Sequence, residues 1–211
     1  MNERSIPLII SQKKSGTIIS DEIQTEIIRK AIHLSSAFVP VLAQLFGRTI
    51  IILLLLSGIL VYTLAEFLRH RGKQIFCISR LTQLASRSQD EGHFVLGPVT
   101  LGIGIVLALM LYPEPAASVA IYALAFGDGL ASLFGKVFGT ITIPFTKGKS
   151  LEGSSTCFAA VFLSSFFILQ NPAQALSIAL FSTILETIPL KDFDNILLPT
   201  GAGLVAFVLL A

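Results

Sequence analysis

The chain alternates between long apolar stretches and short polar connections. A polar segment of mixed charge covers residues 1–28, and apolar stretches dominate the rest. About 20 consecutive apolar residues can cross a bilayer as a helix, which satisfies its own backbone hydrogen bonds. We therefore predict an all-α, polytopic membrane bundle with a polar cytoplasmic tail over 1–28 and one transmembrane catalytic domain over 29–211. The seven predicted spans are 31–47, 49–68, 95–111, 116–138, 154–170, 173–188 and 196–211.

The composition agrees with a membrane protein. Hydrophobic residues make up 53% of the 211 residues and charged residues only 13%, against about 25% in soluble domains. The mean hydropathy is +0.80. A net charge of +2 gives no basis for nucleic-acid binding. Cys77 and Cys157 lack the spacing of a metal site, so we expect plain thiols.

The basic residues predict how the chain is oriented. If all seven spans cross the membrane, every Lys and Arg except Arg48 falls on the side of the N-terminal tail. Basic residues are enriched on the cytoplasmic side of membrane proteins. We therefore predict a cytoplasmic N-terminus and candidate chemistry that faces the cytoplasm. The tail lacks the apolar core of a signal peptide.

Asp128 is a carboxylate inside an apolar predicted helix. Its insertion into lipid costs about 2.5–3.5 kcal/mol, so such a residue indicates a functional site. Gly127, Ala131, Gly135 and Gly139 recur every four residues and form one stripe of small side chains. We predict that Asp128 binds a metal ion or substrate. The alternative is a helix-packing seam in which Asp128 pairs with an Arg or Lys.

The segment Lys147-Gly148-Lys149-Ser150 ends in the letters GKS but is not a P-loop. That motif requires a glycine where this chain has Ile143, and it follows a strand. Backbone N–H groups and two lysines at the start of a helix still suit a polyanion. The alternative is an ordinary basic cytoplasmic loop.

Other polar residues stand at the ends of other predicted spans. Arg29 and His33 are i,i+4 neighbours with Lys30 adjacent, which suits contact with a phosphate; an interfacial histidine is the alternative. Glu152 follows Lys149 closely and is expected either to bind a metal or to orient that lysine.

Three further carboxylates belong to the same predicted membrane face. Glu66 can pair with Arg69 at i+3, Glu186 ends the sixth span, and Asp194 precedes the last span beside Asn195. Acids can hold Mg²⁺, cations bind phosphate oxygens, and a carboxylate or histidine accepts a hydroxyl proton, as phosphoryl transfer requires. A site embedded in a membrane favours a lipid acceptor.

The sequence resembles the CTP-dependent lipid kinase family, which includes phytol kinase, dolichol kinase and the yeast-type diacylglycerol kinase. The resemblance rests on RKAIHL, EFLR, GPVTL, ETIPLKDFDNILLP and, above all, GDGLASLFGKVFG followed by GKSLEGS. It implies transfer of the γ-phosphate of CTP to a long-chain lipid alcohol such as phytol, a polyprenol, dolichol or diacylglycerol, with Mg²⁺ as cofactor.

Two other functions fit parts of the pattern. Phosphatidate cytidylyltransferases share the central motifs and make CDP-lipids, but they carry a Gly/His-rich stretch where this chain runs from Asn195 straight into Ile196. A small ion-coupled transporter would use Asp128, Glu66 and Glu186 as an ion path. The crowding of polar residues on one face disfavours it.

The kinase hypothesis assigns roles to the candidate residues. Asp128 binds Mg²⁺, Lys149 contacts the β- and γ-phosphates, and Glu152 assists the metal or the lysine. Asp194 is a second metal ligand or the base.

The same hypothesis predicts the nucleotide-binding residues and the membrane in which the protein lies. Arg29 and His33 lie near the transferred phosphoryl group. The compact chain is similar to prokaryotic or phytol-kinase-like members, so a prokaryotic plasma membrane is expected, and the small-residue stripe also suits a homodimer. The predicted nucleotide-binding residues are Lys30, Gly127, Lys147, Gly148, Lys149 and Ser150.

Overall fold

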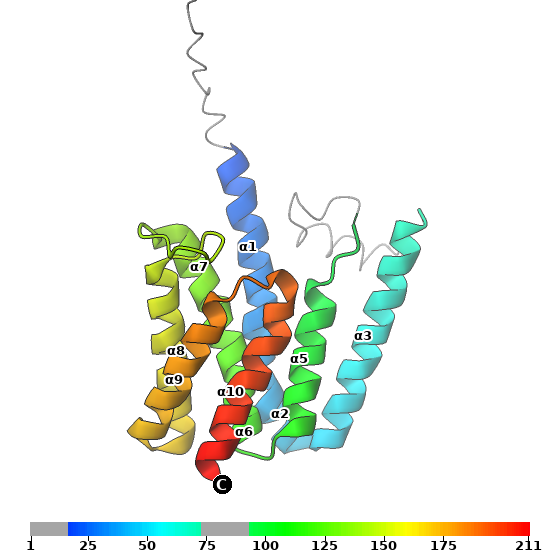
Figure 1. Ribbon diagram of the computed structural model, residues 1–211. Coiled ribbons are helices and arrows are strands. Elements are labelled where there is room, and N and C mark those ends of the chain that lie inside the picture. Colours follow the sequence, from blue (N-terminus) through cyan, green and yellow to red (C-terminus); the bar gives the residue numbers. More distant parts are fainter. Residues whose placement is uncertain (1–16, 73–92) are drawn as a thin grey trace, which may run out of the picture.

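A computed structural model describes residues 17–72 and 93–211, with side chains from residue 25 onward, and the elements in these ranges are helices (Figure 1). The predicted all-α class is confirmed. In chain order the elements are α1 (Thr17–Ser35), η1 (Ser36–Phe38), α2 (Val39–Phe46), α3 (Arg48–His70), α5 (Gly97–Leu111), α6 (Ala116–Tyr122), η3 (Ala123–Asp128), α7 (Gly129–Phe138), α8 (Leu151–Leu169), α9 (Pro172–Thr187), η4 (Lys191–Phe193) and α10 (Asp194–Leu210).

Each of the seven predicted spans coincides with helix. Within the described ranges, four helical stretches are long and apolar enough to cross a membrane: Arg48–His70, Ala116–Phe138, Leu151–Leu169 and Lys191–Leu210. Helix α5 is apolar but shorter. Helix α1 begins at one end of the bundle and the chain ends at the other (Figure 1), which is consistent with an odd number of crossings. Seven crossings and a cytoplasmic N-terminus remain predictions.

Local sequence explains where several helices begin. The side chain of Ser150 accepts a hydrogen bond from Gly153 N (3.1 Å) and caps α8. Asn171 accepts from Ala173 N (3.0 Å) and caps α9, whose first residue is Pro172. Asn171-Pro172 therefore separates α8 from α9, as the sequence predicts.

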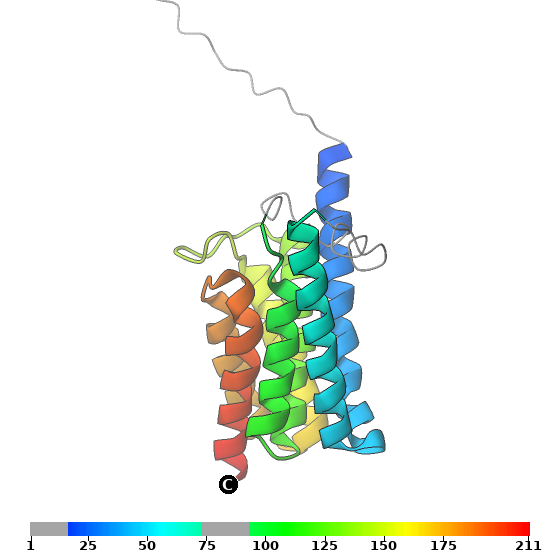
Figure 2. The ribbon, with the colours of Figure 1, turned by 90° about the vertical axis from the view of Figure 1, so that its right-hand side faces the viewer.

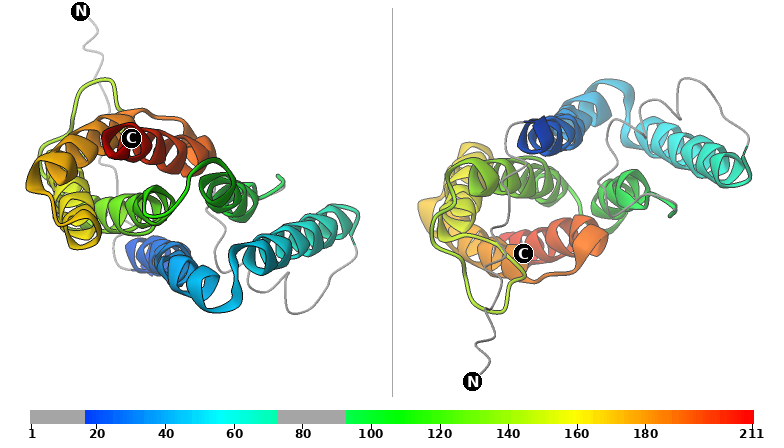
Figure 3. Two further views of the ribbon diagram at one scale, coloured as in Figure 1. Left: turned by 90° about the horizontal axis from the view of Figure 1, so that it is seen from below. Right: turned by 90° about the horizontal axis from the view of Figure 1, so that it is seen from above.

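The continuous helical stretch α6–η3–α7 forms the centre of the bundle. Its apolar window is 67% buried, whereas that of α3 is only 17% buried. Helix α3 stands at one edge and packs on α2 and α5 (Figure 3). Exposed leucines and isoleucines cover its outer surface, including Leu53, Leu54 and Leu60. Such a surface suits lipid rather than water.

Helix α1 extends past the other helices at the end where it begins (Figures 1 and 2). It starts at Thr17, inside the segment predicted as a polar tail. Glu26 of that segment is 1% exposed and contacts α7 through Ser132 and Lys136. The end of the predicted tail is thus packed against the bundle.

The predicted stripe of small residues lies between α7 and α8. A Cβ atom on Gly127 would lie 2.9 Å from Val161 Cγ2, and one on Gly135 would lie 3.5 Å from Gly153 Cα. Ala131 is buried on the same line. Small residues permit this close approach of two helices. Because the stripe packs inside the chain, the homodimer predicted through it gains no support.

Gly104→Ala should destabilise the crossing of α5 and α10. The added Cβ would overlap the backbone O of Asn195, which cannot move as a side chain would. We expect a loss of about 1–3 kcal/mol in the free energy of unfolding. Thermal unfolding of the detergent-solubilised protein measures it.

Gly58→Ala in α3 is the matched control, since nothing lies within 4 Å of the added Cβ. It should be neutral or stabilising by up to about 1 kcal/mol, because alanine favours helix over glycine. Equal behaviour of the two variants would contradict the close crossing.

Candidate active site

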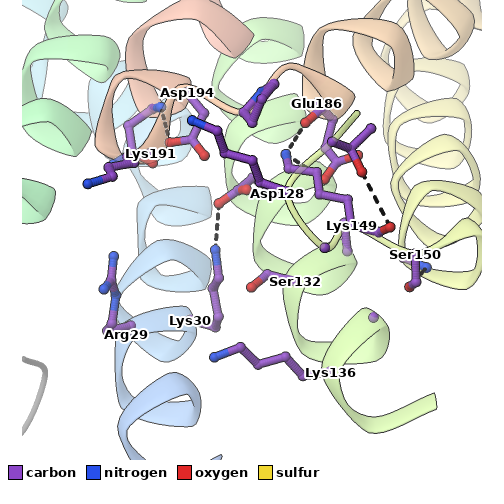
Figure 4. A pocket seen from close by; sticks show the side chains of 18 of the residues that line it. Arg29, Lys30, Asp128, Ser132, Lys136, Lys149, Ser150, Glu186, Lys191 and Asp194 are labelled. Carbon is purple, nitrogen blue, oxygen red and sulfur yellow. Dashed lines mark hydrogen bonds and ion pairs between the residues drawn. The ribbon is translucent and has the colours of Figure 1, made fainter. Parts of the chain in front are cut away.

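A cavity of about 390 Å³ opens where α1, η3, α7, the α7–α8 loop and the α9–α10 connection meet (Figure 4). Its volume lies in the range of small-molecule sites, about 300–1,000 Å³. Nine of the eleven predicted site residues line it, and Gly127 and Glu152 do not. The polar lining residues are Arg29, Lys30, His33, Asp128, Ser132, Lys136, Thr146, Lys147, Lys149, Ser150, Glu186, Lys191, Asp192, Asp194 and Asn195.

Asp128 lines the cavity and contacts α1. Lys30 Nζ donates to Asp128 Oδ2 at 2.6 Å, and His33 Nδ1 is 3.3 Å from the same oxygen. All three residues are buried. Both features of the helix-packing alternative are therefore observed: small residues line the helix seam, and Asp128 pairs with Lys30. The same contacts also bring the predicted site residues of α1 next to Asp128 of η3.

A π-helical turn sets the direction of the Asp128 side chain. η3 spans Ala123–Asp128 and interrupts the α-helical path from α6 to α7. Such turns are rare and occur often at functional sites, because they rotate the following side chains. Gly127 packs against α8 and Gly129 against Leu34 of α1, so both flanking glycines hold Asp128 between neighbouring helices.

Lys149 is anchored by a residue that the site prediction omits. Its Nζ lies 2.9 Å from Glu186 Oε1 and also donates to the backbone O of Glu186. Ser154 Oγ donates to Glu186 Oε2 at 3.1 Å. Glu186 therefore fixes Lys149 at the cavity wall. In the sequence, the position of Glu186 at the end of an apolar span indicates that it could belong to the site.

Glu152 is not brought to the cavity. Its Oε1 accepts hydrogen bonds from Thr140 N (3.0 Å), Thr140 Oγ1 and Ile141 N (3.3 Å). These bonds attach the start of the α7–α8 loop to the first turn of α8. Glu152 thus stabilises the loop that carries Lys149, without lying beside Asp128 or Asp194.

The α9–α10 connection contributes the remaining acids. Arg29 Nη2 lies 3.5 Å from Asp192 Oδ1. Asp194 Oδ1 accepts from Asn195 N at 2.9 Å, and the Asn195 side chain donates to Thr100 Oγ1 at 3.0 Å. Asp194 and Asp128 both line the cavity (Figure 4). The two predicted metal-binding aspartates therefore share one cavity.

Ser132 and Lys136 line the cavity and form a second polar cluster with Glu26. Glu26 accepts from Ser132 Oγ and Lys136 Nζ, both at 2.7 Å. Ser132 and Lys136 follow Asp128 by four and eight residues in the sequence. Residues with this spacing lie on the same face of a helix, so the sequence could have indicated both. Neither was among the predicted site residues.

Cations exceed acids in the cavity lining. Lysine and arginine side chains number six, and the aspartates and glutamates number four. Among the described residues, Lys147 and Lys191 make no ion pair, so two cations are available to an anion. The excess of positive charge favours a polyphosphate over a neutral ligand.

Glu66 lies outside this cavity. It pairs with Arg69 (Nε to Oε2, 2.7 Å), as the i+3 spacing predicts, and accepts from Val95 N at 3.0 Å. The ion path proposed for a transporter joined Glu66 to Asp128 and Glu186. Only the latter two line the same cavity.

Comparison with curated proteins finds phytol and farnesol kinases among the similar sequences. The chain is 28% identical over 156 residues to a probable phytol kinase of Triticum aestivum, covering 65% of this chain and 52% of the relative. It is 29% identical over 141 residues to a farnesol kinase of Arabidopsis thaliana (59% and 46%), and 25% identical over 155 residues to phytol kinase 1 of that plant (65% and 51%). This chain is a homologue of phytol and farnesol kinases.

The predicted resemblance to phytol kinases is thereby confirmed. The chain spans about half the length of the curated relatives it matches. These relatives are described as chloroplastic, so they give no support to a prokaryotic membrane. No family model and no solved structure matches the chain.

Lys30→Met should destabilise the fold by leaving Asp128 buried without its lysine. Breaking one side of a buried ion pair costs about 3–5 kcal/mol. The double variant Lys30→Met/Asp128→Asn should recover most of that loss, because no unpaired charge remains. Unfolding of the detergent-solubilised variants measures both. A single variant as stable as the parent chain would refute the buried pair.

Proposed function

We propose that the chain is a kinase that transfers the γ-phosphate of CTP to a long-chain isoprenoid alcohol. One observation carries the proposal: a cavity with aspartates and an excess of lysines opens at one end of an apolar helix bundle. The sequence relatives are phytol and farnesol kinases, which supports a lipid alcohol as acceptor. The preference for CTP follows from the family resemblance.

The phosphates would occupy the side of the cavity formed by the α7–α8 loop. Lys147, Gly148 and Lys149 line that side and lead directly into the capped N-terminus of α8. Helix N-termini favour anions, because their N–H groups and dipole present positive charge. Lys191 lines the cavity from the α9–α10 connection and would be a further cation for the phosphates.

The donor set suits a phosphate-bound Mg²⁺ rather than a protein-only metal site. No group of three metal-binding side chains occurs among residues 25–72 and 93–211. Mg²⁺ in kinases is held by one or two carboxylates together with phosphate oxygens. Asp128 would supply such a carboxylate, and the ion would neutralise phosphate charge during transfer. Lys30 now balances the Asp128 charge at 2.6 Å.

The acceptor would keep its chain in the bilayer and bring its hydroxyl to the cavity. The hydroxyl oxygen forms a bond to the γ-phosphorus, the bond to the β–γ bridging oxygen breaks, and CDP leaves with that electron pair. We assign the hydroxyl proton to Asp194, which lines the same cavity as Asp128. By the distribution of basic residues, we assign the cavity to the cytoplasmic face.

Asp128→Asn should abolish phosphate transfer. Purified protein with γ-labelled CTP and a panel of phytol, farnesol, a polyprenol and diacylglycerol should produce a labelled lipid. We expect a loss of at least about 10²-fold, because a charge-stabilising group is removed. Glu114→Gln is the control, since Glu114 pairs with Ser118 away from the cavity.

Two results would contradict the kinase assignment. One is a parent chain that labels none of these alcohols. The other is release of pyrophosphate with formation of a CDP-lipid from phosphatidate, which would identify a cytidylyltransferase.

Removal of divalent metal should stop transfer, and Mg²⁺ should restore it. Asp194→Asn should then lower kcat by about 10²-fold, as expected for loss of a general base. The Mg²⁺ concentration for half-maximal rate should stay unchanged in that variant. A large increase in that concentration would make Asp194 a metal ligand instead, and full activity in EDTA would exclude the metal requirement.

A further inference from the structure

The α7–α8 loop holds a large apolar side chain away from the protein. Phe145 is 100% exposed. Its backbone φ is 66°, in the left-handed region that bulky residues rarely adopt. Lys147 and Gly148 also have positive φ, so the chain turns sharply just after Phe145. The turn directs the lysines to the cavity while Phe145 contacts none of it.

Hydrogen bonds define the shape of this loop. Ile143 N donates to Lys149 O and Leu151 N donates to Ile141 O, both at 2.8 Å. Thr146 Oγ1 donates to Ile143 O at 2.7 Å inside the turn. The exposure of Phe145 is therefore a property of an ordered hairpin-like loop.

Further exposed apolar side chains stand near the end of α7 and at the start of the loop. Phe134, Val137 and Phe138 of α7 and Ile141 of the loop are each at least 41% exposed. Helix α7 ends one of the stretches able to cross a membrane, and α8 begins the next. Figures 2 and 3 show the loop extending sideways from the bundle instead of along the helix axes. The loop thus lies at the level where these helices leave the bilayer.

We propose that the tip of this loop, with Phe145, inserts into the headgroup region of the lipid bilayer that surrounds the bundle. The partner is lipid because the loop joins two stretches that are each long and apolar enough to cross a membrane, and Phe145 is fully exposed at its tip. The opposite side of the same turn presents Lys147 and Lys149 to the cavity. Contact with the membrane therefore fixes one wall of the cavity. The inference does not depend on the proposed kinase activity.

A tryptophan at the tip tests the insertion directly, because the chain contains no tryptophan of its own. The full chain carrying Phe145→Trp is reconstituted into vesicles whose acyl chains are brominated near the headgroup or near the chain end. Lys147→Trp is the matched control, two residues away and on the cavity side. Ile141→Trp is a second reporter on the apolar surface, used if F145W does not fold.

For F145W we expect blue-shifted emission and about twofold stronger quenching by lipids brominated near the headgroup than by those brominated near the chain end. K147W should instead be quenched by aqueous iodide. Iodide quenching of F145W equal to that of K147W, without quenching by brominated lipid, would overturn the proposal. Blue-shifted emission that brominated lipids leave unchanged would also overturn it, because the tip would then contact protein.

Discussion

The ion pair between Lys30 and Asp128 is the interaction on which the arrangement of this site depends. A carboxylate in an apolar bundle is expensive unless a cation lies beside it, and α1 supplies that cation at 2.6 Å. The pair joins residues far apart in the sequence and fixes α1 against η3. That contact also brings Arg29 and His33 to the cavity.

The other side of the cavity depends on a similar constraint. Lys149 precedes the capped start of α8, and Glu186 at the end of α9 holds it. Glu152 secures the loop before it through backbone hydrogen bonds. Two lysines held by two buried acids thus face each other across one space. Such pairs hold each lysine in a defined position near the membrane interface. There the lysine can bind a phosphate oxygen in place of its carboxylate partner.

Features set by neighbouring residues could be predicted from the sequence. The pair of Glu66 and Arg69 follows from i+3 spacing, the break at Asn171-Pro172 from capping chemistry, and the helical regions from apolar length. The seam along Gly127 and Gly135 followed from the spacing of small residues.

Features set by packing could not be predicted in this way. The π-helical turn before Asp128 requires the surrounding helices, and no local pattern marks it. Glu152 and Glu186 looked equivalent, since both stand at helix ends on one face. Their roles differ because the first turn of α8 directs Glu152 towards Thr140, while the last turn of α9 directs Glu186 towards Lys149. The start of α1 at Thr17 was hidden by the polar character of this segment, of which Glu26 is buried by contact with α7.

If the cation-lined cavity binds a nucleoside triphosphate, calorimetric titration should detect it. The reconstituted protein is titrated with Mg²⁺ and a CTP analogue that cannot be cleaved between the β- and γ-phosphates. We expect saturable binding that Lys149→Ala weakens at least about tenfold, about 1.4 kcal/mol, through loss of a charge-assisted contact. Absence of binding, or equal affinity in the two proteins, would contradict it.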